Sequence, residues 1–77
     1  MIEGQIVYSK CGRDKGQPFV IVSVKDDFVY LVNGGSRPLG KPKKKKGKHV
    51  QPTLTIVDVH TDADICKEVK RCQRTMS

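Results

Sequence analysis

The sequence has little aromatic character. It contains no tryptophan, two tyrosines and two phenylalanines in 77 residues. Grooves that bind proline-rich peptides are usually lined by aromatic rings, so this scarcity disfavours a module of that kind. Composition does not exclude other protein partners. A protein-interaction module that binds an acidic protein partner therefore stays as the alternative to the function predicted below.

Motifs that carry catalysis are also missing. The sequence shows no recognisable Ser/His/Asp or Cys/His arrangement, no phosphate loop that ends in Gly-Lys-Ser/Thr, and no Cys-x-x-Cys spacing. Gly34-Gly35-Ser36 is followed by no helical pattern, so a turn explains it better than a phosphate loop. We therefore predict a protein that is not an enzyme, with no catalytic residue, no metal and no cofactor.

Cysteines and long apolar runs are few. Cys11, Cys66 and Cys72 are odd in number, which is not typical of a disulfide-stabilised secreted domain. No stretch approaches the roughly 20 apolar residues of a membrane span, and Glu3 near the start does not fit a signal peptide. The expectation is a cytoplasmic protein with reduced thiols and no membrane partner.

Acidic residues are absent from one segment, residues 37–50. Four bases balance four acids in residues 1–36, and the same balance holds in residues 51–77, so the net charge of +7 lies between them. Its carriers are Arg37, Lys41, Lys43, Lys44, Lys45, Lys46 and Lys48. Like charges at this density repel one another, and a polyanion would relieve the repulsion with release of counterions. Nucleic acid is the predicted partner of this basic loop, and a merely solvated lysine run is the alternative.

Short β-branched and aromatic runs indicate strands. They lie at residues 5–9, 19–24 and 28–32, and the last two are joined by a polar turn at Asp26 and Asp27. Residues 49–51 and 54–57 can form two more, separated near Pro52 because proline cannot donate to a ladder. Five short strands predict a mostly β fold, a small five-stranded barrel over residues 1–60 that carries the basic loop.

The tail changes to a helical period. Ile65, Val69, Cys72 and Met76 recur at spacings of four, three and four, after a capping sequence that begins at Thr61. Residues 61–77 are therefore predicted as a C-terminal α-helix, packed on the barrel or extending from it. Because the chain is short, barrel and helix are expected to form a single domain.

The N-terminal half resembles a known family. The run from Gly4 to Ser9, the loop from Gly12 to Gly16 and the strand at 19–24 are similar to a KOW motif, with Gly16 at its fixed glycine. The likeness continues through residues 28–32 and 41–53, as in short bacterial KOW-domain RNA-binding proteins related to eukaryotic-type large-subunit ribosomal proteins. It implies an SH3-like barrel that binds ribosomal RNA of the large subunit, with ribosomal proteins as further partners.

The predicted RNA-binding residues follow from charge and position. Lysine is a flexible point charge, so the run should follow the phosphate backbone more than base identity. The predicted contacts are Arg37, Lys41, Lys43, Lys44, Lys45, Lys46, Lys48 and His49, with Arg13 and Lys15 beside Gly16 as a second contact. The aromatic residues Tyr8, Phe19, Phe28 and Tyr30 are predicted as core, with stacking on bases as the alternative.

Overall fold

The computed structural model describes residues 1–75, with the backbone alone for residues 73–75. Met76, the last residue of the predicted apolar stripe, lies outside the described residues. The elements in chain order are β1 (Gln5–Ser9), β2 (Pro18–Lys25), β3 (Phe28–Val32), β4 (Lys43–Lys46), a 3-10 turn (Gly47–His49), β5 (Val50–Ile56) and α1 (Asp62–Thr75).

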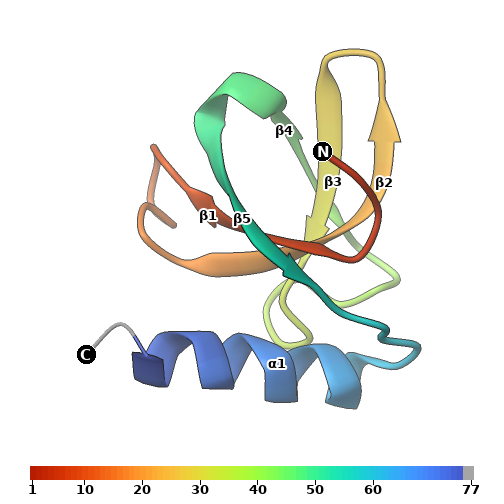
Figure 1. The fold of residues 1–77 in the computed structure, drawn as a ribbon. Helices are drawn as coiled ribbons and strands as arrows, with labels where there is room; N and C mark the ends of the chain where they lie inside the picture. Colours follow the sequence, from red (N-terminus) through yellow and green to blue (C-terminus); the bar gives the residue numbers. More distant parts are fainter. Residues whose placement is uncertain (76–77) are drawn as a thin grey trace.

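The five strands form one antiparallel sheet in the order β4-β3-β2-β1-β5. The sheet is strongly bent, and α1 lies across one end of it (Figure 1). Strands β4 and β5 are the two edges of the sheet, and the 3-10 turn connects them. Because these two strands do not pair with each other, the sheet is open between them. The predicted mostly β, SH3-like fold with five strands and a C-terminal helix is confirmed.

The central strands are buried on both faces. One face forms the interior of the bent sheet, where the buried residues are Val7, Phe19, Ile21, Val29, Leu31 and Val50. On the other face Ile6, Val20 and Val32 pack against Ile65 and Val69 of α1. Side chains alternate between the faces of a strand, so a continuous apolar run such as Phe19-Val20-Ile21 serves both cores.

Helix α1 packs on the bent sheet through the predicted stripe. Ile65 and Val69 are buried, and Cys72 packs against the same cluster. The hydroxyl Oγ1 of Thr61 accepts a hydrogen bond from the backbone N–H of Asp64 at 3.2 Å, which confirms the predicted capping start. Among residues 1–75 no helix has the length and apolarity needed to cross a membrane.

The last two strands differ from the prediction. The fourth strand is Lys43–Lys46, and the two segments expected at 49–51 and 54–57 are one strand, Val50–Ile56. Proline is tolerated there because β5 is an edge strand, paired only with β1. The β1–β5 register shifts between Gln5 and Val7, where Thr53 Oγ1 donates to the carbonyl of Ile6 at 2.7 Å.

Gly34 brings the β3–β4 loop against the start of α1. Its φ is +77°, and an added Cβ would lie 2.4 Å from the carbonyl oxygen of Asp62 and 2.6 Å from the backbone nitrogen of Cys66. Gly16 has a similar φ of +84°, but an added Cβ would meet nothing within 4 Å. The two glycines therefore share a backbone conformation, but only Gly34 is crowded by neighbouring atoms.

Gly34→Ala is expected to destabilise the protein more than Gly16→Ala. Both variants place alanine in the left-handed region, at a cost of about 1 kcal/mol in the free energy of unfolding. Gly34→Ala must also move α1 away from the loop, which should add about 2 kcal/mol. Urea denaturation followed by circular dichroism measures both losses, and equal losses would show that α1 moves aside without cost.

Candidate nucleic-acid interface

The lysines of β4 point alternately to its two faces. Lys43 pairs with Leu31 and Lys45 with Val29, both of which are interior residues of β3. Lys44 pairs with Tyr30 and Lys46 with Phe28. Because residues directly opposite one another in a sheet share a face, Lys43 and Lys45 lie on the inner face and Lys44 and Lys46 on the outer face.

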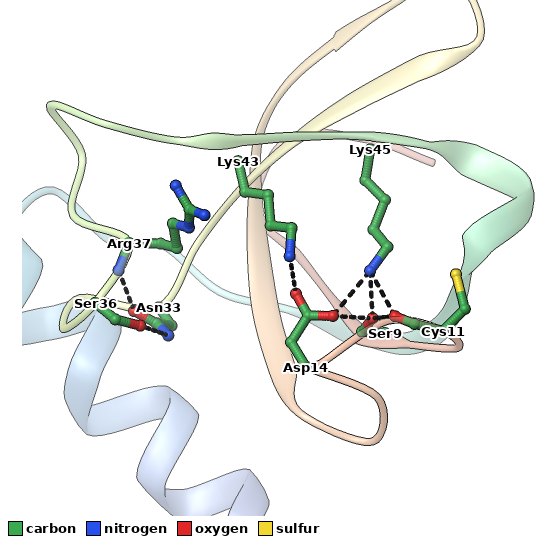
Figure 2. Close-up of polar contacts among 8 residues, drawn as sticks. All are labelled: Ser9, Cys11, Asp14, Asn33, Ser36, Arg37, Lys43 and Lys45. Carbon is green, nitrogen blue, oxygen red and sulfur yellow. Dashed lines mark hydrogen bonds and ion pairs between the residues drawn. The ribbon is translucent and has the colours of Figure 1, made fainter.

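Lys45 is buried and fully hydrogen-bonded. Its side chain is 8% exposed. Its Nζ donates to Ser9 Oγ at 2.6 Å, to the carbonyl of Cys11 at 2.9 Å and to Asp14 Oδ1 at 2.9 Å (Figure 2). These three bonds use all three protons of the ammonium group, so Lys45 has no donor left for a ligand.

Asp14 is the carboxylate that balances the inner lysines. It forms ion pairs with both Lys43 and Lys45, and its Oδ1 lies 2.8 Å from the hydroxyl of Ser9 (Figure 2). Burial by itself would raise the pKa of Asp14, but hydrogen bonds from Lys43, Lys45 and Ser9 outweigh that effect and hold the pKa well below its usual range. Ser9, Asp14, Lys43 and Lys45 are called the Asp14 cluster below.

The Asp14 cluster corrects the predicted basic loop. Residues Lys43–Lys46 lie on a strand, and the ammonium groups of Lys43 and Lys45 are engaged inside the protein. Neither Asp14 nor Ser9 is among the site residues predicted from the sequence. Two signals were available: Asp14 is the one acid in a loop bounded by Gly12 and Gly16, and four consecutive lysines give two of the same charge to each face of a strand.

The depressed pKa of Asp14 predicts a dependence of stability on pH. A carboxyl whose pKa is lower in the folded chain stabilises the fold above its unfolded pKa of about 4, and this contribution is lost as the pH falls from there toward the folded pKa. Asp14→Asn should therefore be less stable than wild type at pH 7, and the difference should shrink on acidification. Urea unfolding at several pH values measures it. Glu3→Gln, at an exposed carboxylate that forms no ion pair among the described residues, is the control and should follow the wild-type curve.

The outer face of β4 has cations beside aromatic rings. The Nζ of Lys44 lies 4.3 Å from the centroid of the Phe28 ring, within the range of a cation–π contact. Lys46 is exposed, and Phe28 and Tyr30 are half-buried. Among the described side chains, no acid forms an ion pair with Lys44 or Lys46. The outer face therefore presents positive charge to solvent.

The aromatic residues divide accordingly. Phe19 is 2% exposed and belongs to the interior core, as predicted. Tyr8, Phe28 and Tyr30 are half-buried and belong to neither buried cluster, so the prediction that they are core residues is wrong for these three. Burial and the neighbouring Cys72 both raise the pKa of Tyr8, which faces α1. Phe28 and Tyr30 lie on the lysine-bearing outer face instead.

Arg13 and Arg37 come together from distant parts of the sequence. Both line an open hollow of about 440 Å³, whose wall also includes Lys43 and Phe19. The Arg37 loop is fixed by Asn33, whose Oδ1 accepts hydrogen bonds from the backbone nitrogens of Gly35 and Arg37 at 2.9 Å each. The Arg37 guanidinium points away from Asn33, on the side where Lys43 lies (Figure 2). Of the two residues of the predicted second contact, Arg13 thus adjoins the basic segment.

The other predicted residues are placed less centrally. Lys15 is exposed and does not line the hollow with Arg13. Lys41 and Lys48 are exposed, before and after β4. His49 was predicted on a strand but ends the 3-10 turn, where its carbonyl accepts a hydrogen bond from the backbone nitrogen of Lys10 at 2.8 Å. The backbone N–H of Gly16 donates to the carbonyl of Ser9 at 2.8 Å and closes the first loop.

Fold and surface define a small, mostly β protein whose strand β4 presents Lys44 and Lys46 to solvent. In the part of the chain that the structure describes, no group of three or more His, Cys, Asp or Glu residues could hold a metal ion. No protein-family model matches the chain, and no curated protein matches its sequence. The resemblance to KOW-domain proteins therefore stays a prediction. A proposal about function has to rest on the geometry of β4 and the loops beside it.

Proposed function

We propose that this protein is a non-catalytic RNA-binding protein that holds RNA phosphates on the outer face of β4 and the segments beside it. The observation that supports this is the division of the β4 lysines. Asp14 neutralises the inner pair, whereas Lys44 and Lys46 on the outer face have no acidic partner among the described side chains. Charge that serves the fold is thereby separated from charge that is available to a ligand.

The proposed phosphate-binding set is smaller than the set predicted from the sequence, because Asp14 engages Lys43 and Lys45 and because Lys15 lies outside the hollow that Arg13 lines. The predicted lysines and arginines that remain form no ion pair in the described part of the chain: Arg13, Arg37, Lys41, Lys44, Lys46 and Lys48. Each phosphate that a lysine or arginine neutralises releases condensed counterions, and this release drives binding. The half-buried rings of Phe28 and Tyr30 beside these lysines suit RNA, whose unpaired bases can stack on aromatic side chains.

Ribosomal RNA of the large subunit is the proposed RNA, with a cytoplasmic location and ribosomal proteins as neighbours. The choice of ribosomal RNA depends on the resemblance of residues 2–53 to KOW-domain proteins. It is tested by co-sedimentation of the tagged protein with ribosomal particles on a sucrose gradient. Stable migration with the large subunit, abolished by ribonuclease, is the expected result, and migration at the top of the gradient would contradict it.

RNA binding as such is tested by its dependence on salt. The logarithm of the binding constant should fall linearly with the logarithm of salt concentration, with a slope of about 0.7–0.9 per phosphate contact. Fluorescence anisotropy with a labelled RNA measures the slope. If polyglutamate competes as well as RNA of equal charge, an acidic protein is the better partner and the proposal fails.

A further inference from the structure

A second hollow opens at the end of the barrel opposite α1. It has a volume of about 480 Å³ and lies between the β2–β3 hairpin and the 3-10 turn after β4. The tip of the hairpin and the turn lie together at the top of Figure 1, far from the helix. The backbone N–H of Gly47 donates to the carbonyl of Asp27 at 2.9 Å and holds the two segments together.

The lining of this hollow combines apolar and cationic groups. Val24, Phe28 and Val29 supply its apolar side together with Met1, and Lys46 and Lys48 supply positive charge. Val24 is 42% exposed, so an apolar surface faces solvent here without a partner among the described residues. The cation of Lys44 lies over the Phe28 ring, which adds a third positive charge beside the hollow.

The combination suits a nucleotide better than a simple anion. A free phosphate would need only the lysines and would gain nothing from the apolar side, whereas a nucleotide has a base whose π face can pack against the Phe28 ring and a phosphate for the lysines. Asp26 and Asp27 also line the hollow. Their carboxylates would repel a bare anion, but they can accept hydrogen bonds from the amino group of a base.

We propose that this hollow holds one unpaired nucleotide of RNA, with its base against Phe28 and its phosphate on Lys46 and Lys48. The inference rests on the proposed function and adds to it a preference for single-stranded RNA. A base within a duplex is stacked on both sides and cannot enter the hollow. Phosphate contacts alone would not distinguish a single strand from a duplex in this way.

The test compares two fluorescein-labelled RNAs with equal numbers of phosphates, a single-stranded oligoadenylate and a blunt duplex, by fluorescence anisotropy at one salt concentration. Adenine is chosen because its amino group can donate to Asp26 or Asp27. Wild type should bind the oligoadenylate more tightly. Phe28→Leu keeps an apolar side chain without the ring, so it should weaken oligoadenylate binding about fivefold or more and leave duplex binding within about twofold.

Tyr8→Leu is the matched control. Tyr8 is also a half-buried aromatic residue, but it lies beside Cys72 of α1 and does not line the hollow. The variant should keep the wild-type preference for oligoadenylate. If Phe28→Leu weakens both RNAs equally or neither of them, the inference is overturned while the proposed function stands. If wild type binds neither RNA, both fail.

The hollow can also be tested in the wild-type protein, without any substitution. Adenosine monophosphate is titrated into protein with carbon-13 methyl groups and followed by NMR. A base in the hollow should shift the methyl signals of Val24 and Val29 by its ring current, while those of Leu39, which does not line the hollow, stay in place. Saturating ligand that leaves Val24 and Val29 unshifted would overturn the inference.

Discussion

Replacing Asp14 by alanine is expected to lower the free energy of unfolding by about 3 kcal/mol, because it leaves a buried ammonium group without its counter-charge. The loss falls on Lys45, whose side chain is 8% exposed and therefore gains little hydration in place of the lost carboxylate. Lys43 is 28% exposed and can turn outward, so it adds little. Urea denaturation at pH 7, followed by circular dichroism, measures the loss.

A second substitution separates loss of charge balance from loss of packing. Lys45→Met replaces the ammonium by an apolar group beside Val29, so Asp14→Ala combined with Lys45→Met should recover most of the stability that Asp14→Ala loses. Lys46→Met, on the exposed face of the same strand, is the control and should change stability by less than about 0.5 kcal/mol. If the double variant is no more stable than Asp14→Ala, the buried charge of Lys45 is not the cause of the lost stability.

Removing the outward-facing lysines is expected to abolish most RNA affinity without unfolding the protein. The variant replaces Lys41, Lys44, Lys46 and Lys48 by glutamine, all at exposed positions. Four lost phosphate contacts should make the salt slope shallower by about 3 units and weaken binding at physiological salt by about two orders of magnitude. Anisotropy titrations at several salt concentrations measure both quantities.

The control variant must lose the same net charge as the variant that lacks the outward-facing lysines. Replacing Lys10, Lys25, Lys67 and Lys70 by glutamine removes four exposed lysines that lie outside the segment 37–50. This variant should retain most of the wild-type slope, because those lysines are not placed against the phosphates. Equal losses in the two variants would show that overall charge, and not the face of β4, governs binding.

The fold was largely predictable because its signals are local. Strands β1, β2 and β3 follow β-branched runs, and the stripe of Ile65, Val69 and Cys72 marks α1. Strand β4 was missed because lysine has little intrinsic preference for strands. Pairing with β3 overrides that preference, and this pairing depends on contacts between distant residues.

The candidate site was predictable in charge but not in arrangement. Composition located the positive segment, yet it could not separate Lys43 and Lys45 from Lys44 and Lys46. That separation depends on Asp14, which lies about 30 residues away in the sequence and joins β4 only once the barrel has formed. The approach of Arg13 to Arg37 has the same origin, since it requires two loops to meet at one end of the sheet.

The position of the lysines at an edge of the sheet affects how the protein behaves at high concentration. Strand β4 leaves one side of its backbone without a neighbouring strand, and an unprotected edge would recruit a second copy of the chain. Lys44 and Lys46 give that edge a charge that repels an identical edge, which opposes self-association. If RNA binds there as proposed, it would neutralise the same charges, and occupancy by RNA and solubility of the protein would be coupled through one strand.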